Sequence, residues 1–325
     1  MESFAGRLAV VTGGGTGMGR ELVVQLAAEG CSVAACDVHV DNLAETERLA
    51  RAGAPYGTRV TSHRADVSVE EDLVRFRDEA VAAHDADHVD LVFNNAGIGG
   101  GGSFVAGDRD EWERTFGVCW NGVYFGARTF LPLLVAAPEG HLVNTSSVNG
   151  FWAALAEGMP HTAYCSAKFA VKGFSEALIE DLRVNAPHVS VHVVMPGHIG
   201  TDIMHNSRRV HRGDGGDDHE ELEGSRDFLA RSGMEVEVES MSDDEVRAVV
   251  EGFGDAFRDT APLTAAGAAT VILDGVRAGQ WRILVGDDAV ALDAAVRADP
   301  EHVYEPGRES FFAFLADAAD PVDPG

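Results

Sequence analysis

A short apolar run, a glycine-rich turn and a helical pattern follow one another without a break near the start of the chain. Residues 8 to 11 form the apolar run, which is typical of a strand buried on both faces of a parallel sheet. The turn holds Gly13, Gly17 and Gly19, and residues 21 to 29 have helical periodicity. This order predicts a dinucleotide-binding turn, because glycines let the backbone approach a pyrophosphate at the helix N-terminus.

Thr16 and Met18 lie between these glycines and are further candidates to contact a cofactor. The spacing differs from the Gly-x-Gly-x-x-Gly of other nucleotide folds. A glycine-rich turn without a ligand is the alternative interpretation, and the flanking strand and helix argue against it.

Asp37 ends the next predicted strand, residues 32 to 36, about 20 residues after the glycines, where a ribose-binding acid is expected. Its carboxylate would accept hydrogen bonds from ribose hydroxyls and would repel a 2′-phosphate, which favours NAD over NADP. Thr16 and Val38 bring no cation for such a phosphate, and Arg20 is interpreted as a solvated helix residue. An acid that only starts a loop is the alternative.

Other predicted strands also end in small or polar residues where a cofactor or substrate would lie. Asp66 and Val67 follow the strand at residues 59 to 65 and are expected at the adenine edge. A hydroxyl at the end of residues 142 to 150 is suited to hold a substrate carbonyl. The strand beginning at Leu91 ends in Asn95, Ala96 and Gly97.

Tyr164 and Lys168 are four residues apart, so a helix places them on one face. A free tyrosine titrates near pH ~10, and a fixed positive charge beside it favours the phenolate. The pair therefore suits general acid–base chemistry near neutral pH. A surface pair is the alternative for the spacing alone.

Taken together, these motifs resemble the short-chain dehydrogenase/reductase family, in family order across residues 7 to 201. The resemblance implies an α/β fold, a Rossmann-type doubly wound parallel sheet, in a single domain over residues 1 to 325. It also implies contacts from the Pro196–Gly197 turn, Ile199 and Thr201 to the nicotinamide end of the cofactor. The catalytic tetrad that it implies is Asn121, Ser147, Tyr164 and Lys168.

Two departures from the family pattern border the substrate. The interval from Ser147 to Tyr164 is four residues longer than usual, and residues 202 to 260 form an extended insertion. Residues 205 to 240 include a Gly/Asp/Glu-rich stretch that we expect to be solvated and to act as a mobile lid. A calcium loop at Asp214, Asp217 and Asp218 is the minor alternative, but the spacing misses the usual form, so no metal is expected.

Several aromatic and imidazole side chains are candidates for the pocket. Phe151 and Trp152 are interpreted as pocket wall, with core residues as the alternative. Of the thirteen histidines, His161 and His198 are the candidates to reach the pocket, and scattered surface imidazoles are the default interpretation.

Composition limits the partners. Net charge is −28, which argues against nucleic acid and anionic membranes as partners. No apolar run approaches the ~20 residues of a membrane span, and the N-terminus does not resemble a signal peptide. The four cysteines lack metal-like spacing and are expected to be reduced thiols of a cytoplasmic protein.

The expected activity is NAD-dependent hydride transfer between the cofactor and a secondary alcohol or ketone, by a homotetramer or homodimer, as the resemblance implies. An NADP-dependent carbonyl or 3-oxoacyl reductase is one alternative. A nucleotide-sensing binding protein without turnover is the alternative from another class.

Overall fold

The computed structural model describes residues 1–154, 160–213, 218–229 and 238–305. Within these residues one seven-stranded sheet has the order β3-β2-β1-β4-β5-β6-β9, and every pairing in it is parallel. The doubly wound α/β fold predicted from the sequence is confirmed. The strands are β1 (Leu8–Thr12), β2 (Ser32–Asp37), β3 (Val60–Arg64), β4 (Leu91–Asn94), β5 (Gly140–Thr145), β6 (Val189–Pro196) and β9 (Arg282–Val285).

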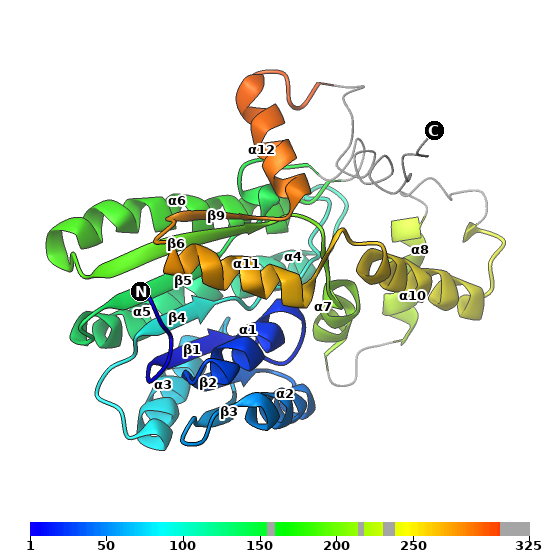
Figure 1. Cartoon of the computed structure of the whole chain (residues 1–325). Coiled ribbons are helices and arrows are strands. Elements are labelled where there is room, and N and C mark those ends of the chain that lie inside the picture. The colour runs from blue at the N-terminus through cyan, green and yellow to red at the C-terminus, as the bar shows by residue number, and fades with distance from the viewer. Residues whose placement is uncertain (155–159, 214–217, 230–237, 306–325) are drawn as a thin grey trace, which may run out of the picture.

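Helices cover both faces of the sheet (Figure 1). In β1, Ala9 and Val11 pack into one core and Val10 into the other, which is why the strand is apolar throughout. One face is covered by α1 (Gly17–Ala28), α2 (Val40–Gly53) and α11 (Ala265–Arg277). The opposite face is covered by α3 (Glu70–His84), α5 (Gly122–Ala136) and α6 (Thr162–Asn185).

The strand order reverses between β1 and β4, where the chain winds outward in both directions. In sheets of this kind a crevice opens beyond the carboxyl ends of the strands at that reversal, and ligands bind there. The glycine-rich turn follows β1 and the segment from Asn95 to Gly102 follows β4, so both lie at this crevice.

The sequence pattern of residues 110 to 136 predicts one long helix that carries Asn121, and a π-helical turn interrupts it. The chain forms α4 (Arg109–Phe116), then a π turn (Gly117–Asn121), then α5. The prediction of one continuous helix was therefore wrong at its centre. Such turns occur frequently at functional sites, and this one ends at Asn121.

The long insertion begins and ends at a small two-stranded sheet, β7 (Ile199–Gly200) with β8 (Leu263–Thr264). It contains α7 (Ile203–Arg212), α8 (Asp218–Leu229) and α10 (Asp243–Asp259), which gather beyond one end of the main sheet (Figure 1). Residues 212 to 224 are rich in Gly, Asp and Glu, which predicts that they cannot pack a core, and this prediction was wrong at Leu222. Leu222 packs with Leu229, Val238, Val246 and Val250 in a separate hydrophobic cluster that joins α8 to α10.

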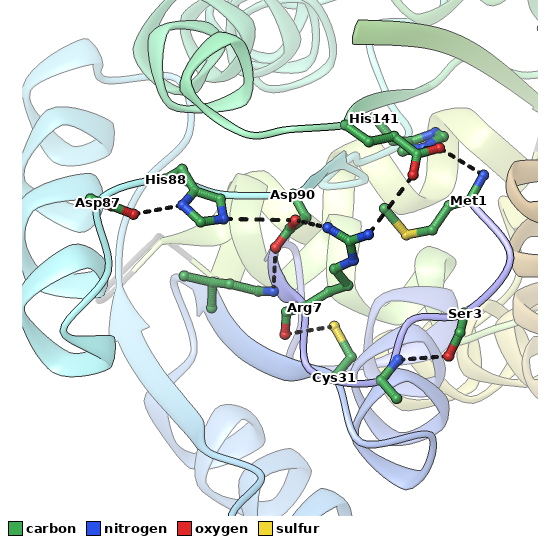
Figure 2. Close-up of polar contacts among 11 residues, drawn as sticks. Met1, Ser3, Arg7, Cys31, Asp87, His88, Asp90 and His141 are labelled. Carbon is green, nitrogen blue, oxygen red and sulfur yellow. Dashed lines mark hydrogen bonds and ion pairs between the residues drawn. The ribbon is translucent and has the colours of Figure 1, made fainter. Parts of the chain in front are cut away.

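An ion pair at the amino end of the sheet joins β1 to β4. The Asp90 carboxylate accepts hydrogen bonds from the Arg7 guanidinium and from the Leu8 backbone N–H, both at 2.8 Å. Figure 2 shows Asp90 facing Arg7. His88 approaches the same carboxylate at 3.9 Å. The last described helix is α12 (Asp287–Ala298), and none of the helices in the described residues is long and apolar enough to cross a bilayer.

Candidate active site

The glycine-rich turn and the segment after β4 are in direct contact. The Thr12 hydroxyl accepts hydrogen bonds from the backbone N–H groups of Asn95, at 3.0 Å, and Ala96, at 3.1 Å. A Cβ atom on Gly13 would lie 2.7 Å from Ala96 Cα, and one on Gly19 would lie 2.0 Å from the Gly13 carbonyl oxygen. Both glycines are therefore required by the close approach of backbone to backbone.

Asp37 lies at the end of β2 and holds the turn. Its carboxylate accepts hydrogen bonds from the N–H groups of Gly15 and His39, both at 3.0 Å. The Arg20 guanidinium donates to the Gly15 carbonyl at 2.6 Å and to the Thr46 hydroxyl at 3.0 Å. The interpretation of Arg20 as a solvated residue was wrong, because it braces the turn against α2.

Thr201 faces the turn from the insertion side. Gly17 has φ of 52°, and a Cβ atom there would lie 3.2 Å from Thr201 Cγ2. Pro196 ends β6, and the N–H of Gly197 donates to the Val285 carbonyl at 3.0 Å. The segment from Pro196 to Thr201 therefore runs beside the end of the sheet that also holds the glycine-rich turn.

Of the other predicted cofactor residues, Ile199 and Met18 have their side chains in or against the core on the α1 face. Asp66 accepts hydrogen bonds from the Ser68 N–H at 2.9 Å and hydroxyl at 2.6 Å, both through one carboxylate oxygen. The Val67 side chain is buried, and a Cβ atom on Gly122 would lie 2.7 Å from it.

Tyr164, Lys168 and Ser147 come together between α6 and the end of β5. The Lys168 side chain is 2% exposed, and its ammonium donates to the Thr145 carbonyl at 2.9 Å. The ammonium nitrogen also lies 5.3 Å from the Tyr164 ring centroid. The Ser147 hydroxyl, at the N-cap of a short 3₁₀ turn (Val148–Gly150), accepts from the Asn149 N–H at 3.1 Å and lies close enough to the Tyr164 side chain to lower the pKa of Tyr164.

Burial dominates the electrostatics of this pair. It raises the pKa of Tyr164, against which the nearby Ser147 hydroxyl acts. Burial also lowers the pKa of Lys168, since it penalises the charged ammonium. The lowering of the Tyr164 pKa by Lys168 stays a prediction.

Asn121, the fourth member of the predicted tetrad, ends the π turn that faces the segment after β4. In that turn the Cys119 thiol donates to the Ile98 carbonyl at 3.2 Å. A Cβ atom on Gly97 would lie 3.5 Å from the Lys168 ammonium nitrogen and 3.8 Å from Cys119 Sγ. The π turn, Gly97 and Lys168 are thus neighbours, and the proposed role of Asn121 stays a prediction.

Of the two candidate histidines, one contacts the tyrosine and the other is held in the scaffold. The His161 ring centroid lies 4.8 Å from that of Tyr164, and burial lowers the pKa of His161 to about 4. The backbone N–H of His198 donates to Asp288 at 2.6 Å, and its ring donates to the Phe257 carbonyl at 2.6 Å.

The extended segment after Ser147 is described as far as Ala154. Trp152 is 6% exposed and packs with Ala289 of α12, and Phe151 packs partly buried against the same cluster. The alternative of core residues therefore holds for Trp152. The calcium-loop candidates Asp214 and Asp217 lie outside the described residues, as does the side chain of Asp218. Phe228 and Met234, which the sequence offers as apolar residues to cover the substrate, are likewise outside them, Phe228 in its side chain.

One residue at this site was missed by sequence reasoning. Asn206 of α7 donates from its amide to the Thr16 hydroxyl at 2.9 Å. The two residues are 190 positions apart, and no motif in the chain connects them.

Comparison with known proteins shows the family of the chain. The family model of short chain dehydrogenases matches residues 7–211. A protein of Mycobacterium tuberculosis named as oxidoreductase SadH is 35% identical over 297 residues, which cover 91% of this chain and 92% of that protein.

Two solved structures show the range of the likeness. A short chain dehydrogenase/reductase from Burkholderia phymatum in complex with NAD has a TM-score of 0.73 at 27% identity, covering 100% of this chain and 99% of that one. A metagenomic short-chain oxidoreductase in complex with NADP has a TM-score of 0.53 at 31% identity, covering 60% of this chain and 83% of that one. The chain belongs to the short-chain dehydrogenase/reductase family of oxidoreductases, which use nicotinamide cofactors.

Proposed function

We propose that this oxidoreductase transfers a hydride between NAD and a secondary alcohol or ketone. The observation that carries the proposal is the meeting of Ser147, Tyr164 and Lys168 beside Gly97, in the segment after β4 that contacts the glycine-rich turn. A titratable hydroxyl, a second hydroxyl and a buried cation are what proton transfer to or from an alcohol oxygen requires.

The residues at the crevice fit a dinucleotide. Gly17 lies beside Thr201, has a positive φ and carries no Cβ atom. A pyrophosphate can therefore approach the backbone at the start of α1. Asp37 uses one lone pair of each carboxylate oxygen on backbone N–H groups, so both oxygens retain capacity for ribose hydroxyls.

NAD is favoured over NADP by the same carboxylate. A 2′-phosphate placed at Asp37 would face its negative charge at short range. The guanidinium of Arg20 is bonded to the Gly15 carbonyl and to Thr46 and is held on the inner side of the turn. These contacts support NAD as the cofactor.

Each member of the tetrad has a distinct role in the proposal. The phenolate of Tyr164 takes the proton from the alcohol hydroxyl during oxidation and returns it during reduction. Ser147 holds the substrate oxygen by a hydrogen bond, and Lys168 stabilises the phenolate and binds the nicotinamide ribose. Asn121 supports the proton path to solvent. The nicotinamide, when bound, accepts or returns the hydride.

The experiment is a titration of the full chain with NADH and NADPH followed by turnover on a panel of secondary alcohols and ketones. The panel holds a steroid, a terpenoid alcohol and an aryl carbinol, and an acyl thioester is added to test the alternative reductase. We expect tighter binding of NADH and turnover of at least one alcohol with NAD. Tighter NADPH binding with reduction of an acyl thioester would replace the proposal with a reductase, and binding without turnover on any member would favour a nucleotide sensor.

Three further expectations belong to the proposal. Residues 205 to 240 border the substrate and govern its choice. The chain assembles as a homotetramer or homodimer through the helical segments at about 110 to 136 and 163 to 182, where Trp120 of the π turn, Tyr124 of α5 and Phe174 of α6 form an aromatic cluster. A light-scattering mass equal to the 34.4 kDa of one chain would contradict the assembly.

All four cysteines are buried and form no disulfide, which supports a cytoplasmic location.

A further inference from the structure

Helix α7 makes side-chain hydrogen bonds to both loops that border the cofactor crevice. Its Asn206 amide donates to Thr16, in the glycine-rich turn after β1, at 2.9 Å. Its Ser207 hydroxyl accepts from the N–H of Gly99, in the segment after β4, at 2.8 Å. One helix therefore joins the two sides of the crevice.

Helix α7 makes a second side-chain hydrogen bond to the segment after β4. The His211 ring donates from Nε2 to the Gly99 carbonyl at 2.8 Å, so both backbone groups of Gly99 are held by side chains of α7. The next residue, Gly100, has φ of 127°, and a Cβ atom there would lie 2.5 Å from His211 Nε2. The glycine is therefore needed for the close approach of α7.

The loop that α7 holds is also attached to the helix of the catalytic tyrosine. The Thr162 hydroxyl, at the start of α6, donates to the Gly102 carbonyl at 2.9 Å. The Ala163 N–H donates to the Gly101 carbonyl at 3.1 Å, and a Cβ atom on Gly101 would lie 2.5 Å from that of Ala163. The position of α7 is thus connected to α6 through one glycine-rich segment.

Helix α10 supports α7 from its other side. A Cβ atom on Gly254 of α10 would lie 2.6 Å from the His205 ring, so the two helices are in close contact. The His205 ring lies 3.2 Å from the Asp255 carboxylate, and Arg258 pairs with Asp202 at 2.9 Å. Helix α10 therefore packs against α7 and supports its position at the crevice.

We propose that α7 is a clasp across the cofactor crevice and that Asn206 is a positioning residue that slows release of the dinucleotide. The proposal rests on the proposed function, since it requires a dinucleotide in the crevice between β1 and β4. For a bound dinucleotide to leave along the side that α7 covers, the bonds to Thr16 and Gly99 must open. Asn206 acts through Thr16 and takes no part in hydride or proton transfer.

The clasp is tested by stopped-flow measurement of NADH release from the full chain. Asn206→Ala and Thr16→Val each remove the bond across the glycine-rich turn, and we expect either to speed release about fivefold to tenfold, the usual effect of one hydrogen bond. Because both changes remove the same bond, the double variant should release NADH hardly faster than the faster single variant. Additive effects, or release unchanged by Asn206→Ala, would overturn the proposal.

Two further variants separate a clasp from a general loss of structure. Ser207→Ala opens the other end of α7 and should also speed release. Asn185→Ala is the matched control, because Asn185 is exposed and bonds to Asp181 on its own helix. Its release rate should equal that of the unaltered chain, and faster release in this control would overturn the assignment to α7.

A single-turnover measurement of hydride transfer distinguishes positioning of the cofactor from catalysis. The rate in Asn206→Ala should stay within about twofold of the unaltered chain while release is faster. A parallel fall in the hydride-transfer rate would contradict the assigned role. If the unaltered chain binds neither NADH nor NADPH, the proposed function itself fails, an outcome distinct from nucleotide binding with no effect of the variants.

Discussion

The charge of Asp37 should decide between the two nicotinamide dinucleotides, and Asp37→Asn removes that charge with almost no change in shape. The amide oxygen of the variant can still accept one of the two backbone N–H groups that Asp37 holds, from Gly15 or His39. The glycine-rich turn should therefore keep its conformation, while the negative electrostatic potential at the ribose site is reduced.

The magnitude follows from the two interactions that the carboxylate makes possible. One unit charge at about 5 Å from another, at an effective dielectric constant near 20, costs about 3 kcal/mol, and screening by solvent reduces this to about 2 kcal/mol. NADPH affinity should therefore rise about thirtyfold. Hydrogen bonds to a charged acceptor exceed neutral ones by about 1 kcal/mol, so NADH affinity should fall about fivefold.

The assay is a fluorescence titration with both reduced nucleotides at one fixed salt concentration. Asp41→Asn is the matched control, because it removes the same charge from an exposed position four residues along the chain. The ratio of the two affinities should change about 150-fold in Asp37→Asn and hardly at all in the control. An unchanged ratio in Asp37→Asn would refute the assignment of Asp37 to the ribose.

Three other predictions address stability and the insertion. Asp90→Ala leaves the Arg7 guanidinium and the Leu8 N–H without their acceptor and should lower the free energy of unfolding, measured by denaturant titration, by about 2–4 kcal/mol. Asp87→Ala, at an exposed carboxylate, should leave it unchanged, and equal stabilities of the two variants would contradict this. Burial lowers the pKa of His192 to about 4, so between pH 6.5 and 4 the unfolded chain binds more protons than the folded chain. The free energy of unfolding should therefore fall by about 1.4 kcal/mol for each unit that the pH falls in this range. His192→Asn should flatten this slope, and an unchanged slope would show that His192 does not cause it. Shortening residues 212 to 224 should leave NAD affinity intact and change KM or the substrate ranking. Kinetic constants that are unchanged on every substrate would mean that the segment is a solvated surface loop, and loss of NAD binding would mean that its role is structural.

The central strands could be predicted because burial on both faces leaves a simple trace in the sequence. In β1 every side chain is buried, so the run at residues 8 to 11 is apolar without alternation. Tyr164 and Lys168 could be paired because their four-residue spacing fixes a shared helix face before any tertiary contact is known.

The contacts made by α7 could not be predicted, because they join loops far apart in the chain. Nothing near Asn206 indicates that its amide reaches Thr16, 190 positions away. The π turn that ends at Asn121 was missed for another reason: one additional residue in a helical turn changes the backbone and leaves the apolar pattern on both sides almost intact.

The small core of the insertion was missed because its apolar residues are few and separated by acidic ones. Leu222 and Leu229 lie seven positions apart on α8, and Val246 and Val250 lie four apart on α10. Each helix alone buries little, and the cluster forms only when the two pack together. Composition alone therefore favoured a solvated segment.

The most direct test of the proposed chemistry is turnover of an active secondary alcohol by Tyr164→Phe with NAD, measured together with NADH affinity. The variant keeps the ring that packs against His161 and lies near Lys168 but removes the only hydroxyl assigned to proton transfer. We predict a fall in kcat of at least about a thousandfold with NADH affinity within about threefold. Turnover close to that of the unaltered chain would contradict the account.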